Sequence, residues 1–284
     1  MKDFRVRMAR PDDVVAVVRI ANQAFLETAR LTGPIGRSFA QQLRDGGEWL
    51  FVVEDEDGRV VGFLLGRHSG DTAKIGWIAV HPNYWGMGIG GMLLRAIEEK
   101  ARRMGLRAVE TGTPFARSFY EKYGFKCIGV QRALILEIAG KSIEPPQEVR
   151  TRPLLLDDLS SLANIMGRDD YLSLLSSYFS TFQSDPEKAL LSLDGENVVG
   201  VVIGRADSIY RDLVTLEYLY SVEPRYALSL LYGLVYLSSV EGLRWVGVRF
   251  PVPHIDEEEL RKKGWKDGEL PTFWTRYWMR KDLK

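Results

Sequence analysis

The sequence has one cysteine, three histidines and no excess of charge of either sign. Cys127 alone cannot form a disulfide within the chain, which fits a reducing compartment. The histidines His68, His81 and His254 lie far apart and show no spacing typical of metal ligands, so we expect no metal site. The 38 basic and 38 acidic residues cancel, which removes the electrostatic signature of a dedicated nucleic-acid-binding protein.

Long hydrophobic runs are missing as well. The longest nearly apolar stretch, residues 226–240, is too short to span a bilayer and predicts a buried helix. Residues 1–5 contain no apolar segment of the kind found in signal peptides, so we expect a cytoplasmic protein with no membrane partner. The 284 residues suffice for two domains of about 140 residues each, and we expect a monomer or a homodimer.

The same unit occurs twice along the chain. Segment 60–67, Val-Val-Gly-Phe-Leu-Leu-Gly-Arg, returns as segment 198–205, Val-Val-Gly-Val-Val-Ile-Gly-Arg, and each is the second strand of a predicted hairpin. In both halves a helix with acidic residues in its first turn precedes the hairpin. An apolar strand, a turn with Pro and Tyr, and a long helix before Gly-Leu-Arg follow it, and a short helix and a strand close the unit. The sequence therefore predicts a tandem duplication.

A polar stretch with paired prolines, residues 140–147, separates the two halves and interrupts both helix and strand. We therefore expect an α+β protein with mixed sheets, divided into domains 1–140 and 148–284.

In the first half, a glycine-rich loop lies between the predicted strand 75–80 and the amphipathic helix 90–104. Glycines at positions 86, 88, 90 and 91 let the backbone turn tightly and bring successive N–H groups close to an anion. The positive end of the following helix adds to this effect, which is typical of a pyrophosphate site.

Two other interpretations of this loop are open from the glycines alone. A dinucleotide-binding turn needs a parallel βαβ unit at the start of the domain and an acidic residue about twenty positions onward. Here the loop instead follows a predicted antiparallel hairpin. A loop with a purely structural role is the second alternative.

The residues around the loop carry a more specific resemblance. The motif from Val80 to Leu94 has His81-Pro82 and Tyr84-Trp85-Gly86 before Gly88-Ile89-Gly90, and a second motif runs from Phe119 to Phe125, Phe-Tyr-Glu-Lys-Tyr-Gly-Phe. Together they resemble the Gcn5-related N-acetyltransferase (GNAT) superfamily over residues 4–138. The chain is thus expected to contain two tandem acyl-CoA N-acyltransferase folds. It departs from the family's Arg/Gln-x-x-Gly-x-Gly/Ala signature at the first position, where Trp85 stands.

The resemblance implies acetyl-CoA as acetyl donor and assigns residues to it. The edge of the strand should pair with the pantetheine arm as an added strand, and main-chain N–H groups of the loop should bind the pyrophosphate. The family's frequent Asn, seven residues before its tyrosine, is replaced here by Thr113. The expected cofactor-binding residues are Ile78, Ala79, Val80, Trp85, Gly86, Met87, Gly88, Ile89, Gly90, Gly91, Thr113 and Tyr120.

Tyr120 stands at the family's tyrosine position, where it would protonate the leaving thiolate; a phenol with a pKa near 10 stays protonated at neutral pH. Its alternative role is a core aromatic between Phe119 and Phe125. Glu110, on the strand before Thr113, is the first candidate for the general base, and a salt-bridged strand residue is its alternative. Glu27 is a second candidate for the base.

The second copy is expected to lack the site. Aligning the Pro-Tyr turns places Leu230 over Gly88, and aligning the closing motifs places Leu260 over Tyr120. We therefore expect domain 1–140 to be catalytic and domain 148–284 to be degenerate, without bound CoA. The aromatic cluster 273–278 is expected to pack against the first domain or to line its cleft.

The resemblance implies transfer of acetyl from acetyl-CoA to a primary amine of a small molecule or a peptide. Segment 27–42 is expected to line the acceptor site. Two other functions are open: a non-catalytic acyl-CoA sensor, and a mycothiol-synthase-like or other acyl transferase with the same tandem folds.

Overall fold

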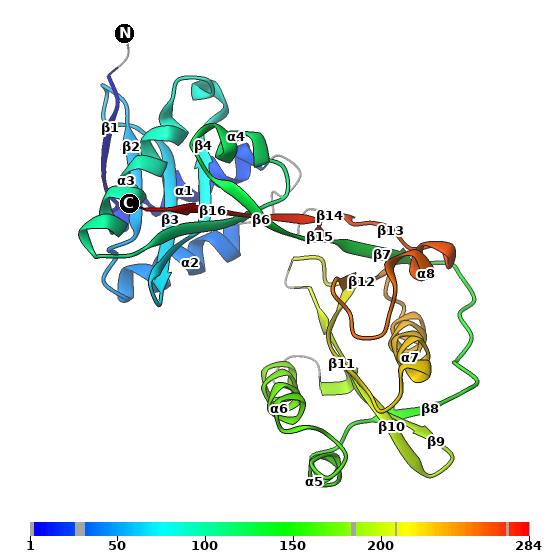
Figure 1. The fold of residues 1–284 in the computed structure, drawn as a ribbon. Helices are drawn as coiled ribbons and strands as arrows, with labels where there is room; N and C mark the ends of the chain where they lie inside the picture. Colours follow the sequence, from blue (N-terminus) through cyan, green and yellow to red (C-terminus); the bar gives the residue numbers. More distant parts are fainter. Residues whose placement is uncertain (1–2, 26–31, 183–185, 208, 271–272, 284) are drawn as a thin grey trace. The chain divides into compact units, whose positions relative to one another are not determined.

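The computed structural model describes residues 3–25, 32–182, 186–207, 209–270 and 273–283, which form two compact units (Figure 1). Unit 1 consists of Met1–Val130 and Arg276–Lys284, and unit 2 consists of Gln131–Thr275. No helix among the described residues is long and apolar enough to cross a membrane.

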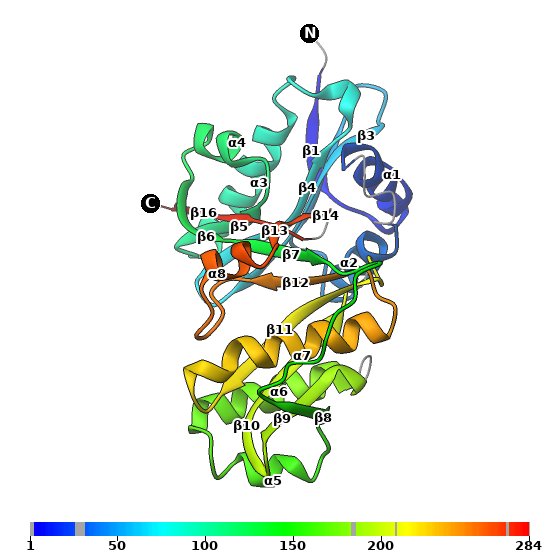
Figure 2. The ribbon, with the colours of Figure 1, turned by 90° about the vertical axis from the view of Figure 1, so that its right-hand side faces the viewer.

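Unit 1 is a mixed sheet in the strand order β1-β2-β3-β4-β5-β16-β6. Figure 2 shows α3 and α4 on one face of this sheet and α1 and α2 on the other. Its elements are β1 (Arg5–Met8), η1 (Pro11–Asp13), α1 (Val14–Ala24), α2 (Thr32–Arg44), β2 (Leu50–Glu54), β3 (Val60–Ser69), β4 (Thr72–Val80), η3 (Pro82–Tyr84), α3 (Ile89–Arg103), β5 (Ala108–Thr113), α4 (Arg117–Lys122), β6 (Lys126–Gln131) and β16 (Arg276–Asp282).

The core of unit 1 follows from alternation along its strands. Leu64 of β3 faces the α3 side, where it packs with Leu93 and Ile97, while its neighbours Phe63 and Leu65 are buried on the opposite face. Gly62 permits this packing, because a Cβ there would lie 2.9 Å from the Cγ2 atom of Ile89.

Unit 2 repeats this architecture in the strand order β13-β7-β12-β11-β10-β9-β8, with β14 and β15 as a small second sheet. Its elements are β7 (Ala133–Glu137), β8 (Arg150–Pro153), α5 (Asp158–Leu162), α6 (Arg168–Phe182), η4 (Pro186–Lys188), β9 (Ala189–Asp194), β10 (Asn197–Ala206), β11 (Leu213–Ser221), η5 (Pro224–Tyr226), α7 (Ala227–Val240), β12 (Trp245–Arg249), α8 (Glu257–Lys262), β13 (Lys266–Asp267), β14 (Glu269–Leu270) and β15 (Phe273–Trp274). The predicted α+β class with two copies of one fold is confirmed.

The two units also share side-chain contacts that hold the same elements together. In unit 1 the Arg7 guanidinium donates to Asp13, which also accepts from the backbone N–H of Arg10. In unit 2 Arg152 donates to Asp158, which accepts from the N–H of Leu155. The tyrosines of the two Pro-Tyr turns form a second such pair. The Tyr84 hydroxyl donates to Asp55 at 2.9 Å, and the Tyr226 hydroxyl donates to Asp194 at 2.7 Å.

The compact units do not divide at the expected boundary between residues 140 and 148. Strand β7, expected in the first domain, pairs with β12 and β13 of unit 2. Strand β16, at the end of the chain, pairs with β5 of unit 1 and lies between β5 and β6. Each copy is therefore completed by the strand that closes the other repeat along the chain. The proline-rich stretch marks a connection, but it carries no information on which sheet the neighbouring apolar strand joins.

This exchange also separates the aromatic cluster 273–278. Phe273 is buried in unit 2 beside Ala133 and Leu213, whereas Tyr277 and Trp278 belong to β16 in unit 1. The expected packing against the first domain therefore holds for Tyr277 and Trp278 and is wrong for Phe273.

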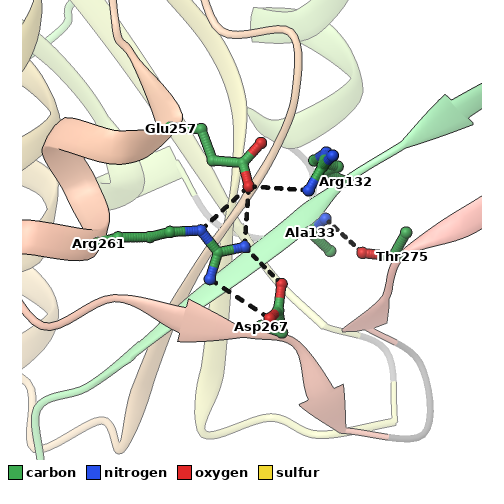
Figure 3. Close-up of polar contacts among 6 residues, drawn as sticks. All are labelled: Arg132, Ala133, Glu257, Arg261, Asp267 and Thr275. Carbon is green, nitrogen blue, oxygen red and sulfur yellow. Dashed lines mark hydrogen bonds and ion pairs between the residues drawn. The ribbon is translucent and has the colours of Figure 1, made fainter.

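A polar network surrounds the start of β7 in unit 2 (Figure 3). Glu257 of α8 accepts from Arg132 at 3.3 Å and from Arg261 at 2.8 Å, and Arg261 also binds Asp267 of β13 at 2.6 Å. On the other side, the N–H of Ala133 donates to the Thr275 hydroxyl. These contacts join α8, β13 and the end of β15 to the exchanged strand.

Candidate functional site

The site begins where two parallel strands of unit 1 separate. Strand β5 pairs with β4 from Thr72 to Ile75, and the described part of the chain supplies no further partner on that side of β4. Thr111 stands at the last paired position, and its hydroxyl donates to the Ile75 carbonyl at 3.3 Å. Ile78, Ala79 and Val80 thus form a strand edge that has no strand partner among the described residues and lines a cavity.

The loop after β4 has the backbone conformation that its glycines permit. Gly86 has a φ of 80° and Gly88 a φ of 81°, and neither has an atom within 4 Å of the position of a Cβ. Gly88 is the N-cap of α3. Because the first N–H groups of a helix have no partner within the helix, the start of α3 presents donors and a positive dipole end to the loop.

Gly90 and Gly91 have a different role from the first two glycines. A Cβ on Gly90 would lie 2.9 Å from Phe119 Cζ, and a Cβ on Gly91 would collide with the Tyr123 hydroxyl. These two glycines therefore allow α4 and the residue after it to pack directly on the first turn of α3.

This edge of β4, the loop and α4 enclose one cavity of about 470 Å³, a size typical of small-molecule sites. It contains nine of the predicted cofactor-binding residues. Its lining residues are Ala24, Phe25, Ile78, Ala79, Val80, Tyr84, Trp85, Gly86, Gly88, Ile89, Gly90, Gly91, Ala116, Phe119, Lys122 and Tyr123.

Trp85, at the position where the family has Arg or Gln, lies at this cavity with its side-chain donor already engaged. Its Nε1 donates to the Val80 carbonyl at 2.7 Å, and 56% of the residue is exposed. The indole thus joins the loop to the end of β4. Met87 is exposed and does not line the cavity.

Tyr120 lies in the core beside the cavity and does not line it. Only 3% of the residue is exposed, and its ring packs against Phe119 at 5.1 Å and Phe125 at 5.4 Å. Burial raises the pKa of Tyr120 to about 12, while a hydrogen bond with the Thr111 hydroxyl acts in the opposite direction. Since Thr111 stands where β4 and β5 separate, the phenol lies at the base of that separation.

The other predicted site residues are placed outside the cavity lining. Glu110 of β5 forms an ion pair with Arg280 of β16 at 2.6 Å. The Thr113 hydroxyl accepts the N–H of Ala116 at 2.9 Å and so holds the turn into α4. Glu27 lies outside the described residues, as do residues 27–31 of the segment expected to line the acceptor site.

Several lining residues were not predicted, most clearly Phe119 and Tyr123. They stand four residues apart on the short helix α4 and its C-cap, so both face the glycine pair of α3. This spacing, together with two adjacent glycines at a helix start, was a usable signal. Among the described residues, no group of three or more His, Cys, Asp or Glu is placed to hold a metal ion.

In unit 2 the corresponding loop is shorter, and the register that places Leu230 over Gly88 is wrong. The turn Pro224–Tyr226 continues directly into α7 at Ala227, whereas four residues separate Tyr84 from the start of α3. Leu230 corresponds to Leu93, since each stands twelve positions before the glycine that ends its helix and each packs over the glycine of its hairpin strand. The equivalence of Leu260 with Tyr120 agrees with the structure, because α4 and α8 match residue for residue.

Residues 15–125, all within unit 1, match the acetyltransferase (GNAT) family. The matched segment covers less than half of the chain, and over this segment the chain is similar to the GNAT family. The predicted resemblance to this family, which rested on the loop and on the motif 119–125, is confirmed for residues 15–125.

One similar sequence and two similar structures show how far this similarity extends. A mycothiol acetyltransferase from Nocardiopsis dassonvillei is 27% identical over 174 residues, which cover 57% of this chain and 52% of that protein. The match thus spans about half the length of this curated relative. A GCN5-related N-acetyltransferase from Sphaerobacter thermophilus superposes with a TM-score of 0.68 at 18% identity, over 99% of this chain and 96% of the other. A tandem GNAT protein from the clavulanic acid biosynthesis pathway superposes with a TM-score of 0.64 at 15% identity, over 100% and 99% of the two chains. These two structures establish the fold over both units.

Proposed function

We propose that unit 1 transfers an acetyl group from acetyl-CoA directly to a primary amine of a small molecule or a peptide. One observation carries this proposal: a single cavity joins the edge of β4 at residues 78–80 to the glycine loop at the start of α3. A strand edge suits the amide-containing pantetheine arm, and a helix start suits a pyrophosphate. Gly86 and Gly88 leave open space where side chains would block the anion.

Bound acetyl-CoA would supply the acetyl group and a thiol leaving group. Two side chains of the protein would then transfer protons: one to the leaving thiolate and one from the attacking amine. Tyr120 keeps its proton at neutral pH because its pKa is raised to about 12, so its hydroxyl is available as a donor at the base of the strand separation. We assign it the role of acid for the leaving thiolate.

Glu110 is our candidate for the base that receives the proton of the amine. It lies one residue before Thr111 on β5, on the opposite side of the strand from Val109 and Thr111. Its carboxylate is held by Arg280, so the ion pair must open or move for the carboxylate to accept a proton. Glu110→Gln should lower kcat by at least about 100-fold if this role is correct.

Calorimetry with acetyl-CoA, followed by thiol detection with a panel of amines, tests the proposal. We expect one acetyl-CoA per chain and thiol release with at least one amine. Because one relative is named as a mycothiol acetyltransferase, amines related to mycothiol belong in the panel beside peptides. Two equivalent sites per chain, or no binding at all, would contradict the proposal.

A second function has a specific observation in its favour. Tyr120 does not line the cavity and Glu110 is held in an ion pair, as would suit a module that binds acyl-CoA without catalysis. Tight binding of acetyl-CoA without thiol release from any amine would favour this alternative.

A further inference from the structure

The loop that is expected to hold a pyrophosphate contains no free side-chain donor. Its sequence from 85 to 91 is Trp-Gly-Met-Gly-Ile-Gly-Gly, in which the indole N–H of Trp85 is the only polar hydrogen on a side chain. That N–H is bound to the Val80 carbonyl at 2.7 Å. The loop can therefore offer an anion its backbone alone.

A hydroxyl from another element reaches the far end of the same loop. Tyr123, the C-cap of α4, is half-buried and packs on Phe119 with ring centroids 5.2 Å apart. Its hydroxyl lies so close to Gly91 that any side chain at that position would collide with it. Tyr123 lines the cavity, and the described residues provide its hydroxyl with no hydrogen-bond partner.

The position of this hydroxyl indicates which part of the ligand it would meet. Gly91 lies in the first turn of α3, where the unpaired backbone N–H groups and the positive end of the helix favour an anion. The reacting end of the cavity lies elsewhere, where β4 and β5 separate beside Thr111 and Tyr120. Lys122, next to Tyr123, is exposed and lines the cavity as well, which adds positive charge at this end.

We propose that the Tyr123 hydroxyl donates a hydrogen bond to the pyrophosphate of the acyl-CoA and so provides the side-chain donor that the loop lacks. This inference rests on the proposed function. It makes Tyr123 a binding residue for the anion. It also explains how the loop can bind a pyrophosphate with Trp85 at the family's Arg/Gln position, because the side-chain donor is then supplied by the C-cap of α4.

Removing the hydroxyl alone tests this role. Tyr123→Phe keeps the ring on Phe119 and should weaken acetyl-CoA binding about tenfold or more, because a hydrogen bond to a charged group is lost. Calorimetry measures the affinity, and thermal melts confirm that the variant is folded. The matched control is Tyr277→Phe, which removes a hydroxyl from a tyrosine of the same core outside the cavity lining and should leave the affinity within twofold.

S-acetylpantetheine, which has no pyrophosphate, separates an anion contact from general packing. Its affinity, read by NMR titration in the millimolar range, should be the same for the wild type and Tyr123→Phe. Adding Trp85→Arg to Tyr123→Phe should recover most of the lost acetyl-CoA affinity, because a guanidinium restores a donor to the loop.

The outcomes distinguish this inference from the proposed function. If the wild type fails to bind acetyl-CoA, both are wrong. If the wild type binds but Tyr123→Phe binds equally well, or loses both ligands to the same degree, the role of Tyr123 is wrong and the proposed function stands. If Trp85→Arg does not restore acetyl-CoA affinity in the Tyr123→Phe variant, the Tyr123 hydroxyl does not replace a side-chain donor at position 85.

Discussion

The two copies of the fold differ most in the stretch between the Pro-Tyr turn and the end of the long helix. In unit 1 the distance from Tyr84 to Gly105 is 21 positions, and in unit 2 the distance from Tyr226 to Gly242 is 16. Both glycines end their helices in the same way, with φ values of 70° and 74°, so the two ends are equivalent. Unit 2 therefore lacks five residues, which are those of the glycine loop and the start of the helix.

What the copies keep shows what the fold requires. Both keep an arginine bonded to the aspartate that starts the first helix, and a tyrosine bonded to the hairpin aspartate. Unit 2 has lost the loop, and Leu260, fully buried, replaces Tyr120. The fold thus forms without the loop and without the phenol, so neither is needed to build this architecture.

Removing the exchanged strand β16 should produce the largest difference in stability between the two copies, because this strand is part of unit 1 alone. A chain that ends at Thr275 lacks β16, which carries the fully buried Met279 and the Lys281 that binds the buried Glu98 at 2.7 Å. We expect unit 1 to lose more than about 5 kcal/mol of stability, which is most of what a domain has. Hydrogen exchange should show protection lost in unit 1 and kept in unit 2.

A chain that ends at Asp282 keeps the whole strand and is the control for this truncation. Equal protection of unit 1 in both shortened chains would mean that β16 is not needed to complete the first copy.

Excising the loop converts the first copy into the geometry of the second. Deletion of residues 85–89 should abolish acetyl-CoA binding, with a loss of at least about 100-fold, while circular dichroism shows a folded chain. The matched pair Gly88→Leu and Gly195→Leu refines the test, because both glycines have positive φ and open space around them. Both substitutions should lower stability by about 1–2 kcal/mol, but only Gly88→Leu should remove binding. Retained affinity in the deletion variant would contradict the assignment of the loop.

The sequence predicted those parts of the fold that depend on local pattern. Hairpins, turns and the long helices have short-range signals, and α7 lies within the apolar stretch 226–240 that predicted a buried helix. The domain boundary was misplaced because the partner of β7 is set by long-range pairing. An apolar strand such as 133–137 could pair within either sheet, and its sequence pattern does not predict which of the two sheets it joins.

The site was predicted to a similar extent and for similar reasons. The glycine loop has a local sequence signal and was predicted, and the structure places it at the cavity. Tyr123 reaches the same cavity through the docking of α4 on Gly91, which has no local signal, and it was not predicted. The register of Leu230 was wrong because the alignment started from the Pro-Tyr turn. Counting back from the shared Gly-Leu-Arg after each helix would have revealed the five missing residues.

Alkaline pH tests the burial of Tyr120, which has no ionisable counterpart at Leu260 in the second copy. Below pH 10 the phenol is protonated in both folded and unfolded chains, so it adds no pH dependence. Above pH 10 the unfolded chain loses the proton, while the fold keeps it up to a pKa of about 12, so the free energy of unfolding falls as pH rises. Relative to Tyr120→Phe, the wild type should lose about 1 kcal/mol more between pH 9 and pH 11, measured by urea unfolding. Parallel curves for the two proteins would mean that the phenol is not buried as described.

A difference of degree is expected for the arginine–aspartate contact that both copies share. Asp13 is the more enclosed of the two, with 8% of its side chain exposed against 17% for Asp158, and its partner Arg7 also binds Glu54 at 2.6 Å. Breaking a buried pair costs more than breaking a partly exposed one. Asp13→Asn should therefore destabilise unit 1 by about 3 kcal/mol, and Asp158→Asn should destabilise unit 2 by about 1–2 kcal/mol, measured by hydrogen exchange at pH 7.

Acid should remove both contributions. Burial by itself would raise the pKa of Asp13, but hydrogen bonds from Arg7 and from the Arg10 amide lower it overall; the pKa of Asp158 is lowered chiefly by Arg152. A lowered folded-state pKa gives stability that is complete above the unfolded value of about 3.9 and is lost as pH falls through the folded value. Each Asn variant should therefore approach the wild type in stability as the pH falls below about 4. In both copies the aspartate accepts hydrogen bonds from one arginine and one backbone amide. Equal costs at neutral pH would therefore mean that the deeper burial of Asp13 and the extra contact of Arg7 with Glu54 do not add to stability.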